Sequence, residues 1–111
     1  MKQLRHGLWA AILLLTACQF LGLEQPRSFS DRLLVGYATV TAVRQSAETM
    51  LVAKAITVDE AVNVQQGADN ARAGLDIAAQ VESVDPKAAD ARLQASMTIL
   101  RALNAYLEGR R

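Results

Sequence analysis

The chain has 111 residues, of which 51% are hydrophobic, and its 12 Lys plus Arg and 11 Asp plus Glu give a formal net charge of +1. It contains one cysteine, which excludes a disulfide within the chain. We therefore expect a fold that is stable without covalent cross-links.

The first seventeen residues have the pattern of an export signal. Lys2 and Arg5 lie in a start that has no acidic residue, and residues 8–15, "LWAAILLL", form an unbroken apolar run. That run has the length of the hydrophobic region of a secretory signal and is too short to span a bilayer by itself. We predict a signal peptide over residues 1–17.

Cys18 ends this segment and is the predicted lipidation site. The four residues "LTAC" (15–18) resemble the lipobox of bacterial lipoproteins. The resemblance implies that the thiol receives a diacylglyceryl group, that the signal is cut before Cys18, and that the new amine is acylated. Several acyl chains hold a soluble domain stably at a bilayer. The alternative is an unmodified cysteine in an uncleaved N-terminal helix.

Gln19, the residue after the cysteine, predicts the membrane to which the lipoprotein is sorted. By resemblance to enterobacterial lipoproteins, a residue other than Asp after the lipidated cysteine implies transfer to the outer membrane, with the protein facing the periplasm. The choice between inner and outer membrane stays open, because this sorting step differs between bacterial groups.

Removal of the signal narrows the available chemistry. His6 and Trp9 leave with it, and the chain from Cys18 onward carries ten basic and eleven acidic residues. This balance argues against nucleic acid as a partner. Without histidine, a catalytic site would need carboxylates, Ser, Tyr, Lys or Arg, and none of these forms a familiar catalytic or metal-binding motif. We predict no enzyme activity, no metal and no cofactor.

The rest of the chain predicts an all-α domain. Residues 18–29 read as the lipidated cysteine and a tether, with Gly22 and Pro26. In residues 30–111 apolar side chains recur every three or four positions, which is typical of amphipathic helices. We predict an antiparallel three-helix bundle with helices over 31–53, 58–83 and 86–108. The expected buried stripes are Leu33, Gly36, Val40, Val43, Ala47 and Met50; Ala61, Val64, Ala68, Ala71, Leu75 and Ala78; and Ala89, Leu93, Ser96, Leu100, Leu103 and Leu107.

The helix boundaries carry capping signals. We expect Ser30 to cap the first helix, since its hydroxyl can accept a hydrogen bond from a free backbone N–H of the first turn. A capping box predicts the start of the second helix, and an aspartate before a proline predicts the start of the third. A glycine marks the end of the third helix. These residues are Thr57 with Glu60, Asp85 with Pro86, and Gly109.

Charged and aromatic residues within the helices predict local roles. Residues three or four positions apart share a helix face, so ion pairs are expected along single helices. The two tyrosines lie beside the apolar stripes, where we expect them to flank the core. The predicted pairs are Arg44 with Glu48, and Arg72 with Asp69 and Asp76; the tyrosines are Tyr37 and Tyr106.

The first helix contains a long uncharged stretch, "LLVGYATVTAV" (33–43). We interpret it as the most buried of the three helices. The alternative is that its second apolar face drives self-association, so the oligomeric state stays open.

Four short strings resemble a group of small uncharacterised helical proteins of proteobacterial phages and prophages. They are "GYATVTAVRQSA" (36–47), "ITVDEA" (56–61), "ADNARAGLD" (68–76) and "LNAYL" (103–107). The resemblance implies a prophage setting and no mechanism. Our leading interpretation is a non-enzymatic interaction module of the cell envelope, and the alternative is a peptidoglycan-directed envelope enzyme of unfamiliar type.

The antiparallel topology predicts where a partner would bind. It places the first interhelical connection and the last residues at the end farthest from the tether, so Lys54, Arg110 and Arg111 should meet there. We expect a basic tip that contacts peptidoglycan or an envelope protein. The alternative is that these cations only complement the helix dipoles.

Overall fold

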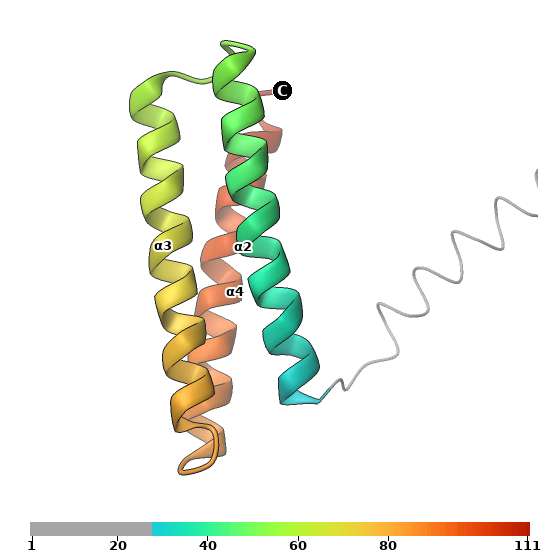
Figure 1. The fold of residues 1–111 in the computed structure, drawn as a ribbon, viewed down its shortest axis with the longest axis vertical. Helices are drawn as coiled ribbons and strands as arrows, with labels where there is room; N and C mark the ends of the chain where they lie inside the picture. The colour runs from blue at the N-terminus through green and yellow to red at the C-terminus, as the bar shows by residue number, and fades with distance from the viewer. Residues whose placement is uncertain (1–27) are drawn as a thin grey trace, which may run out of the picture.

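The computed structural model describes residues 28–111, which form three α-helices (Figure 1). They are α2 (Phe29–Val52), α3 (Val58–Val81) and α4 (Pro86–Glu108), and residues 28–111 contain no strand. The predicted all-α class is therefore confirmed for this part of the chain. The predicted signal helix, Cys18 and the tether up to residue 27 lie outside the described residues.

The three helices are arranged as an antiparallel bundle. In Figure 1, α2 rises from the end where the described chain begins, α3 returns, and α4 rises again. The start of α2 and the connection between α3 and α4 thus share one end, and the connection between α2 and α3 shares the other with the C-terminus. Contact is most extensive between α3 and α4, and α2 packs against both.

Local hydrogen bonds explain where each helix starts. The Thr57 and Glu60 capping box is present, with Glu60 N–H donating to Thr57 Oγ1 at 3.1 Å and Thr57 N–H to Glu60 Oε1 at 2.9 Å. Asp85 caps α4, whose first residue is Pro86. Gly109 is the C-cap of α4. All three predictions are confirmed.

The predicted cap of the first helix is wrong. Ser28, not Ser30, is the N-cap of α2, because its hydroxyl accepts the N–H of Asp31 at 3.2 Å. Ser30 lies inside the first turn, where Asp31 adds a negative charge that the helix dipole favours. The helix consequently begins at Phe29, the last residue of the expected tether and two residues before the predicted start at residue 31.

The predicted stripes form the core almost unchanged. Every residue of the α3 stripe is buried, whereas Leu33 of α2 and Leu103 of α4 are partly buried and pack against the core. Ile56, in the connection before α3, joins the core as well. The helical periodicity of the sequence therefore identified the inner faces correctly.

The expectation that the first helix is the most buried is wrong. Leu34 is 67% exposed and Val35 is 40% exposed, and α3 contributes more buried residues than α2 does. The cause is the distribution of apolar side chains, which lie on all sides of α2. A helix that contacts two neighbours can bury only the side chains on the side that faces them.

Glycines set how closely the helices approach. A Cβ atom on Gly36 would come within 2.9 Å of Leu75, and one on Gly67 within 3.0 Å of Leu103. At Gly74 a Cβ atom would overlap the hydroxyl of Ser96, which is buried on α4. The spacing between α3 and α4 therefore depends on the absence of a side chain at Gly74.

Gly74→Ala should destabilise the bundle although alanine favours helices more than glycine does. We expect a loss of about 1–3 kcal/mol in the free energy of unfolding, because the methyl group meets the Ser96 hydroxyl in a packed interior. Denaturant unfolding followed by circular dichroism measures it. Adding Ser96→Ala should restore most of the loss, with Ser96→Ala alone as the control. Equal losses in the single and double variants would contradict the clash.

Candidate functional site

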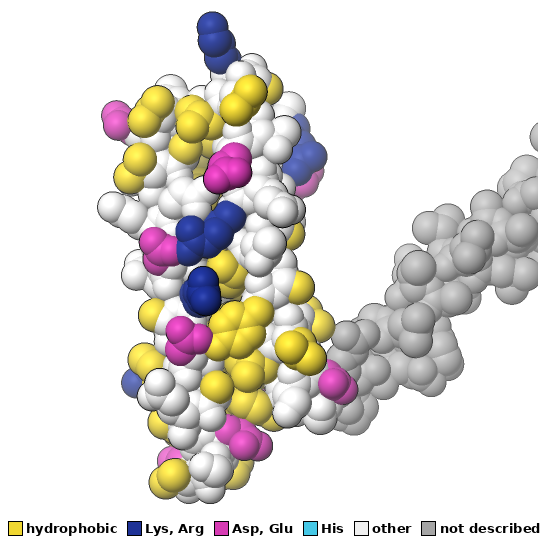
Figure 2. Space-filling view, viewed as in Figure 1, with side chains coloured by type: hydrophobic (Ala, Val, Ile, Leu, Met, Phe, Trp, Pro, Cys, Tyr) yellow, Lys and Arg dark blue, Asp and Glu magenta, His cyan; other side chains and the backbone are white. Residues whose placement is uncertain are grey.

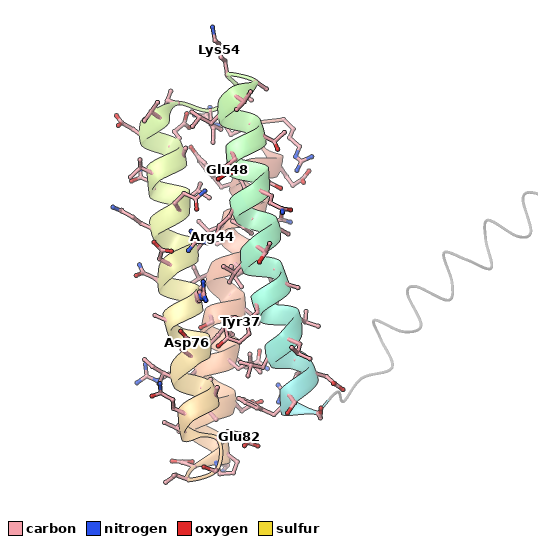
Figure 3. The ribbon with its side chains drawn as sticks, viewed as in Figure 1. Tyr37, Arg44, Glu48, Lys54, Asp76 and Glu82 are labelled. Carbon is pink, nitrogen blue, oxygen red and sulfur yellow. The ribbon has the colours of Figure 1, made fainter. Side chains whose placement is uncertain are left out.

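The three cations of the predicted tip do lie at one end of the bundle. Figure 3 shows Lys54 projecting from the connection between α2 and α3, at the end where the C-terminus lies. The residues differ in what they contact. Arg110 and Arg111 are engaged in ion pairs, whereas Lys54 takes part in none of the ion pairs recorded within residues 28–111.

Lys54 follows the end of α2 in a left-handed backbone conformation, with φ of 62°. Its N–H donates to the Leu51 carbonyl at 3.0 Å, and the N–H of Ala55 donates to the Met50 carbonyl at 2.8 Å. This pair of bonds is the Schellman motif, in which the left-handed position is usually glycine. A lysine there costs about 1 kcal/mol more than glycine would, since its Cβ crowds the following carbonyl.

Arg110 is held against the start of α3. Its Nε donates to Glu60 Oε2 at 2.9 Å, its Nη2 also contacts that oxygen, and its guanidinium lies 5.7 Å from the centre of the Tyr106 ring. The Tyr106 hydroxyl donates to the same carboxylate oxygen. Glu60 therefore serves two elements. Its Oε1 completes the capping box of α3, and its Oε2 accepts hydrogen bonds from Tyr106 of α4 and from Arg110, two residues after the end of α4.

These hydrogen bonds lower the pKa of Glu60 to about 2, from an ordinary value of 4.5. The Tyr106 hydroxyl is the main cause, followed by the Thr57 backbone N–H and Arg110, all of which favour the charged carboxylate. The carboxylate in turn raises the pKa of Arg110. Arg111 contacts Glu108 one turn earlier at 3.3 Å, an exposed pair that contributes little stability.

An open groove runs between α2 and α3 near the same end. Leu51, Val58 and Val62 line it, together with the charged Glu48 and Asp69. Val58 is 65% exposed and Val62 is 47% exposed. Figure 2 shows hydrophobic side chains on this face toward the Lys54 end, then a belt of charged residues, then hydrophobic residues again.

The charged belt contains bonds between α2 and α3, and the ion pairs predicted along single helices are wrong. Arg44 of α2 pairs with Asp69 of α3 and donates to Gln65 Oε1 at 2.9 Å, rather than pairing with Glu48. Asp76 accepts the hydroxyl of Tyr37 instead of pairing with Arg72 (Figure 3). This hydrogen bond, with burial, raises the pKa of Tyr37.

The two tyrosines do flank the core as predicted, but their hydroxyls have a role that the sequence analysis missed. Each donates to a carboxylate on α3, Tyr37 to Asp76 and Tyr106 to Glu60. A further pair, Arg32 with Asp90, joins α2 to α4. The only sequence signal for these partners is the antiparallel topology, which brings the start of α3 beside the end of α4.

The remaining predictions concern chemistry and the membrane. The described residues contain no group of His, Cys, Asp and Glu side chains that could hold a metal ion. Of the helices in residues 28–111, none combines the length and the apolar character needed to cross a membrane. Cys18, the predicted lipidation site, lies outside the described residues.

Comparison with protein-family models, curated protein sequences and solved structures finds no match to this chain. The functional argument therefore depends on the sequence motif and on the geometry of residues 28–111.

The Glu60 cluster predicts a specific dependence of stability on pH. A carboxylate with a lowered pKa contributes stability above its ordinary value of 4.5, and this contribution is lost as the pH falls through its folded value of about 2. Glu60→Gln should therefore be less stable than the parent at pH 7, and the gap should close between pH 4.5 and 2. Thermal unfolding at several pH values measures the gap.

Glu108→Gln is the matched control, because that side chain is 57% exposed and contacts only the neighbouring Arg111. Its unfolding curve at pH 7 should stay close to the parent's. A Glu60→Gln gap that is the same at pH 7 and pH 2 would show that the lost interaction does not depend on the charge.

Proposed function

We propose that this protein is a lipid-anchored, non-enzymatic interaction module of the bacterial cell envelope. In this proposal Cys18 holds the domain at a membrane, by expectation the outer membrane facing the periplasm. The opposite end of the bundle binds anionic groups, for which peptidoglycan is the proposed source. The prophage setting implied by the sequence resemblance belongs to the same proposal.

The order of the elements supports this orientation. Residues 19–28 separate Cys18 from the first helix, and a chain of that length spans at most about 35 Å when extended. The start of α2 must then stay near an anchored Cys18. Because α2 leads away from that point, the connection at Lys54 and the C-terminus lie at the remote end of the bundle (Figure 1).

The observation that carries the proposal is the conformation of Lys54. An exposed lysine occupies a left-handed position where glycine would be more stable, and it projects beyond the bundle (Figure 3). Strained residues of this kind are concentrated at functional sites. Arg110, by contrast, already serves the Glu60 cluster, so we assign it to holding the tip together and assign the outward charge to Lys54.

Cys18→Ser tests the anchor. We expect labelled palmitate to be incorporated into the parent protein in the producing bacterium and not into the variant, because serine lacks the thiol that lipoprotein processing converts into a thioether. Immunoprecipitation followed by autoradiography measures incorporation, and immunoblotting confirms that the variant is made. Palmitate that persists in Cys18→Ser would rule out the anchor.

Lys54→Gly separates binding from stability. The change removes the left-handed strain, so the free energy of unfolding should rise by about 1 kcal/mol. Cosedimentation of the protein with purified peptidoglycan should fall nevertheless, since the variant loses the outward charge. Lys87→Ala is the matched control, because it removes an exposed lysine at the other end of the bundle.

Two outcomes are informative. Reduced sedimentation of Lys54→Gly, with Lys87→Ala unchanged, supports the tip. Equal sedimentation of the parent and both variants would rule out the tip as a binding surface for peptidoglycan. In either case circular dichroism should show unchanged helicity, because both substitutions lie at exposed positions outside the core.

A further inference from the structure

The groove between α2 and α3 is not used by the proposed tip. Its lining combines the partly buried Leu51 with Val58 and Val62, and Val52 beside it is 83% exposed. Exposed apolar side chains that gather in one place typically mark an interface. The charged belt next to them gives the information needed to identify the occupant.

The belt has opposite charges on its two helices at the same height. Arg44 on α2 and Asp69 on α3 pair with each other, yet their side chains remain 32% and 62% exposed. Each could therefore contact a second charge from outside the bundle. The face is consequently self-complementary for one symmetry, a two-fold axis parallel to the helices, which places α2 of each copy over α3 of the other.

We propose that a second copy of this chain occupies the groove and forms a parallel two-fold dimer. Arg44 of each copy then faces Asp69 of the other, which gives a ring of four alternating charges. Leu51, Val58 and Val62 keep their height under this symmetry, so the apolar end of one groove covers the apolar end of the other.

An antiparallel dimer of the same faces is disfavoured by the same charges. Its two-fold axis crosses the helices, so α2 lies over α2 and α3 over α3. When that axis is level with the belt, Arg44 meets Arg44 and Asp69 meets Asp69, and like charges across an interface oppose association. When the axis lies between the belt and the apolar residues, these residues face the charged belt and lose their apolar partner. When the axis is level with the apolar residues, which lie at the end of α2 and the start of α3, only the ends of the two bundles overlap.

The parallel arrangement also agrees with the proposed anchor, although it does not depend on it. Both chains start α2 at the same end, so both tethers can reach one membrane. The two Lys54 side chains then lie at the same remote end. Two linked copies of a weak binding site bind an extended polymer more strongly than one, because the second contact becomes intramolecular.

Disulfide trapping between two chains that each carry one added cysteine tests the dimer in the full-length protein. Because α2 of one copy lies over α3 of the other, a parallel dimer should join Glu48→Cys to Val62→Cys under mild oxidation, both positions lying in the groove. It should also join Thr41→Cys to Ala73→Cys, which lie one turn beyond Arg44 and Asp69 on the same sides of their helices and are exposed.

Asn63→Cys, mixed with Glu48→Cys, is the matched control. Asn63 is exposed and lies about 100° around the helix from Val62, so this mixture should stay monomeric.

Val58→Glu tests the contact without unfolding the helix. Val58 is exposed and is the first residue of α3, where a carboxylate is favoured by the helix dipole. Added to Val62→Cys, it should lower the trapped fraction about tenfold, since a charge then enters the apolar part of the interface. Unchanged circular dichroism confirms that the bundle is intact.

Each result has one meaning. Trapping of both mixed pairs, each between α2 of one chain and α3 of the other, supports the parallel dimer. Trapping of Val62→Cys with itself or with Ala73→Cys, both on α3, indicates the antiparallel form, and trapping to a different protein indicates another occupant. Both results overturn the proposal, as does a monomer. Repeating the experiment with Cys18→Ser keeps the two proposals distinct, because dimers that persist there support the interface whether or not the anchor exists.

Discussion

The close approach of α3 to its neighbours is the constraint on which the rest of the bundle depends. Gly67 and Gly74 face Leu103 and Ser96 of α4, and Gly36 of α2 admits Leu75 of α3. Small residues at a helix contact shorten the distance between axes and let the backbones pack closely. The same residues bring little apolar surface with them. Six of the fifteen buried hydrophobic residues in the described chain are alanines, so this core removes less area from water than one built from leucine.

Polar contacts around the core compensate for this thin apolar interior by fixing the register of the helices. Tyr37 with Asp76 and Arg44 with Asp69 join α2 to α3, and Glu60 joins α3 to Tyr106 at the end of α4. Exposed pairs contribute little net stability each, because water competes for the charges. Their geometric effect is larger, since sliding α3 by one turn would separate all of them. The apolar stripes alone, rich in alanine, would specify that register weakly.

Features that depend on neighbours in the sequence were predictable, and features that depend on contacts between helices were not. The apolar period of three and four residues located all three inner faces, and Thr57 with Glu60 is a local motif that needs no tertiary information. Ser28 and Ser30 offer the same hydroxyl, and only the structure shows that the helix starts early enough for Ser28 to accept the N–H of Asp31. Arg44 could reach Glu48 or Asp69, and only the height of α3 beside α2 decides between them. The Lys54 end was predictable in position from topology, whereas the engagement of Arg110 by Glu60 required the structure.

The number of helices determines what a tethered bundle of this kind can present. An even number of antiparallel helices returns the chain to the end at which it started, so both termini and the final connection would lie near an anchor. Three helices leave the C-terminus at the remote end, beside the connection that carries Lys54 (Figure 1). Each helix rises 1.5 Å per residue, so the 24 residues of α2 separate the two ends by about 36 Å. Side-by-side pairing through the α2 and α3 face would leave that separation unchanged, because the shared axis runs along the helices. The proposed anchoring, pairing and tip binding would therefore use three different parts of the chain, so each should be removable by substitution without loss of the others.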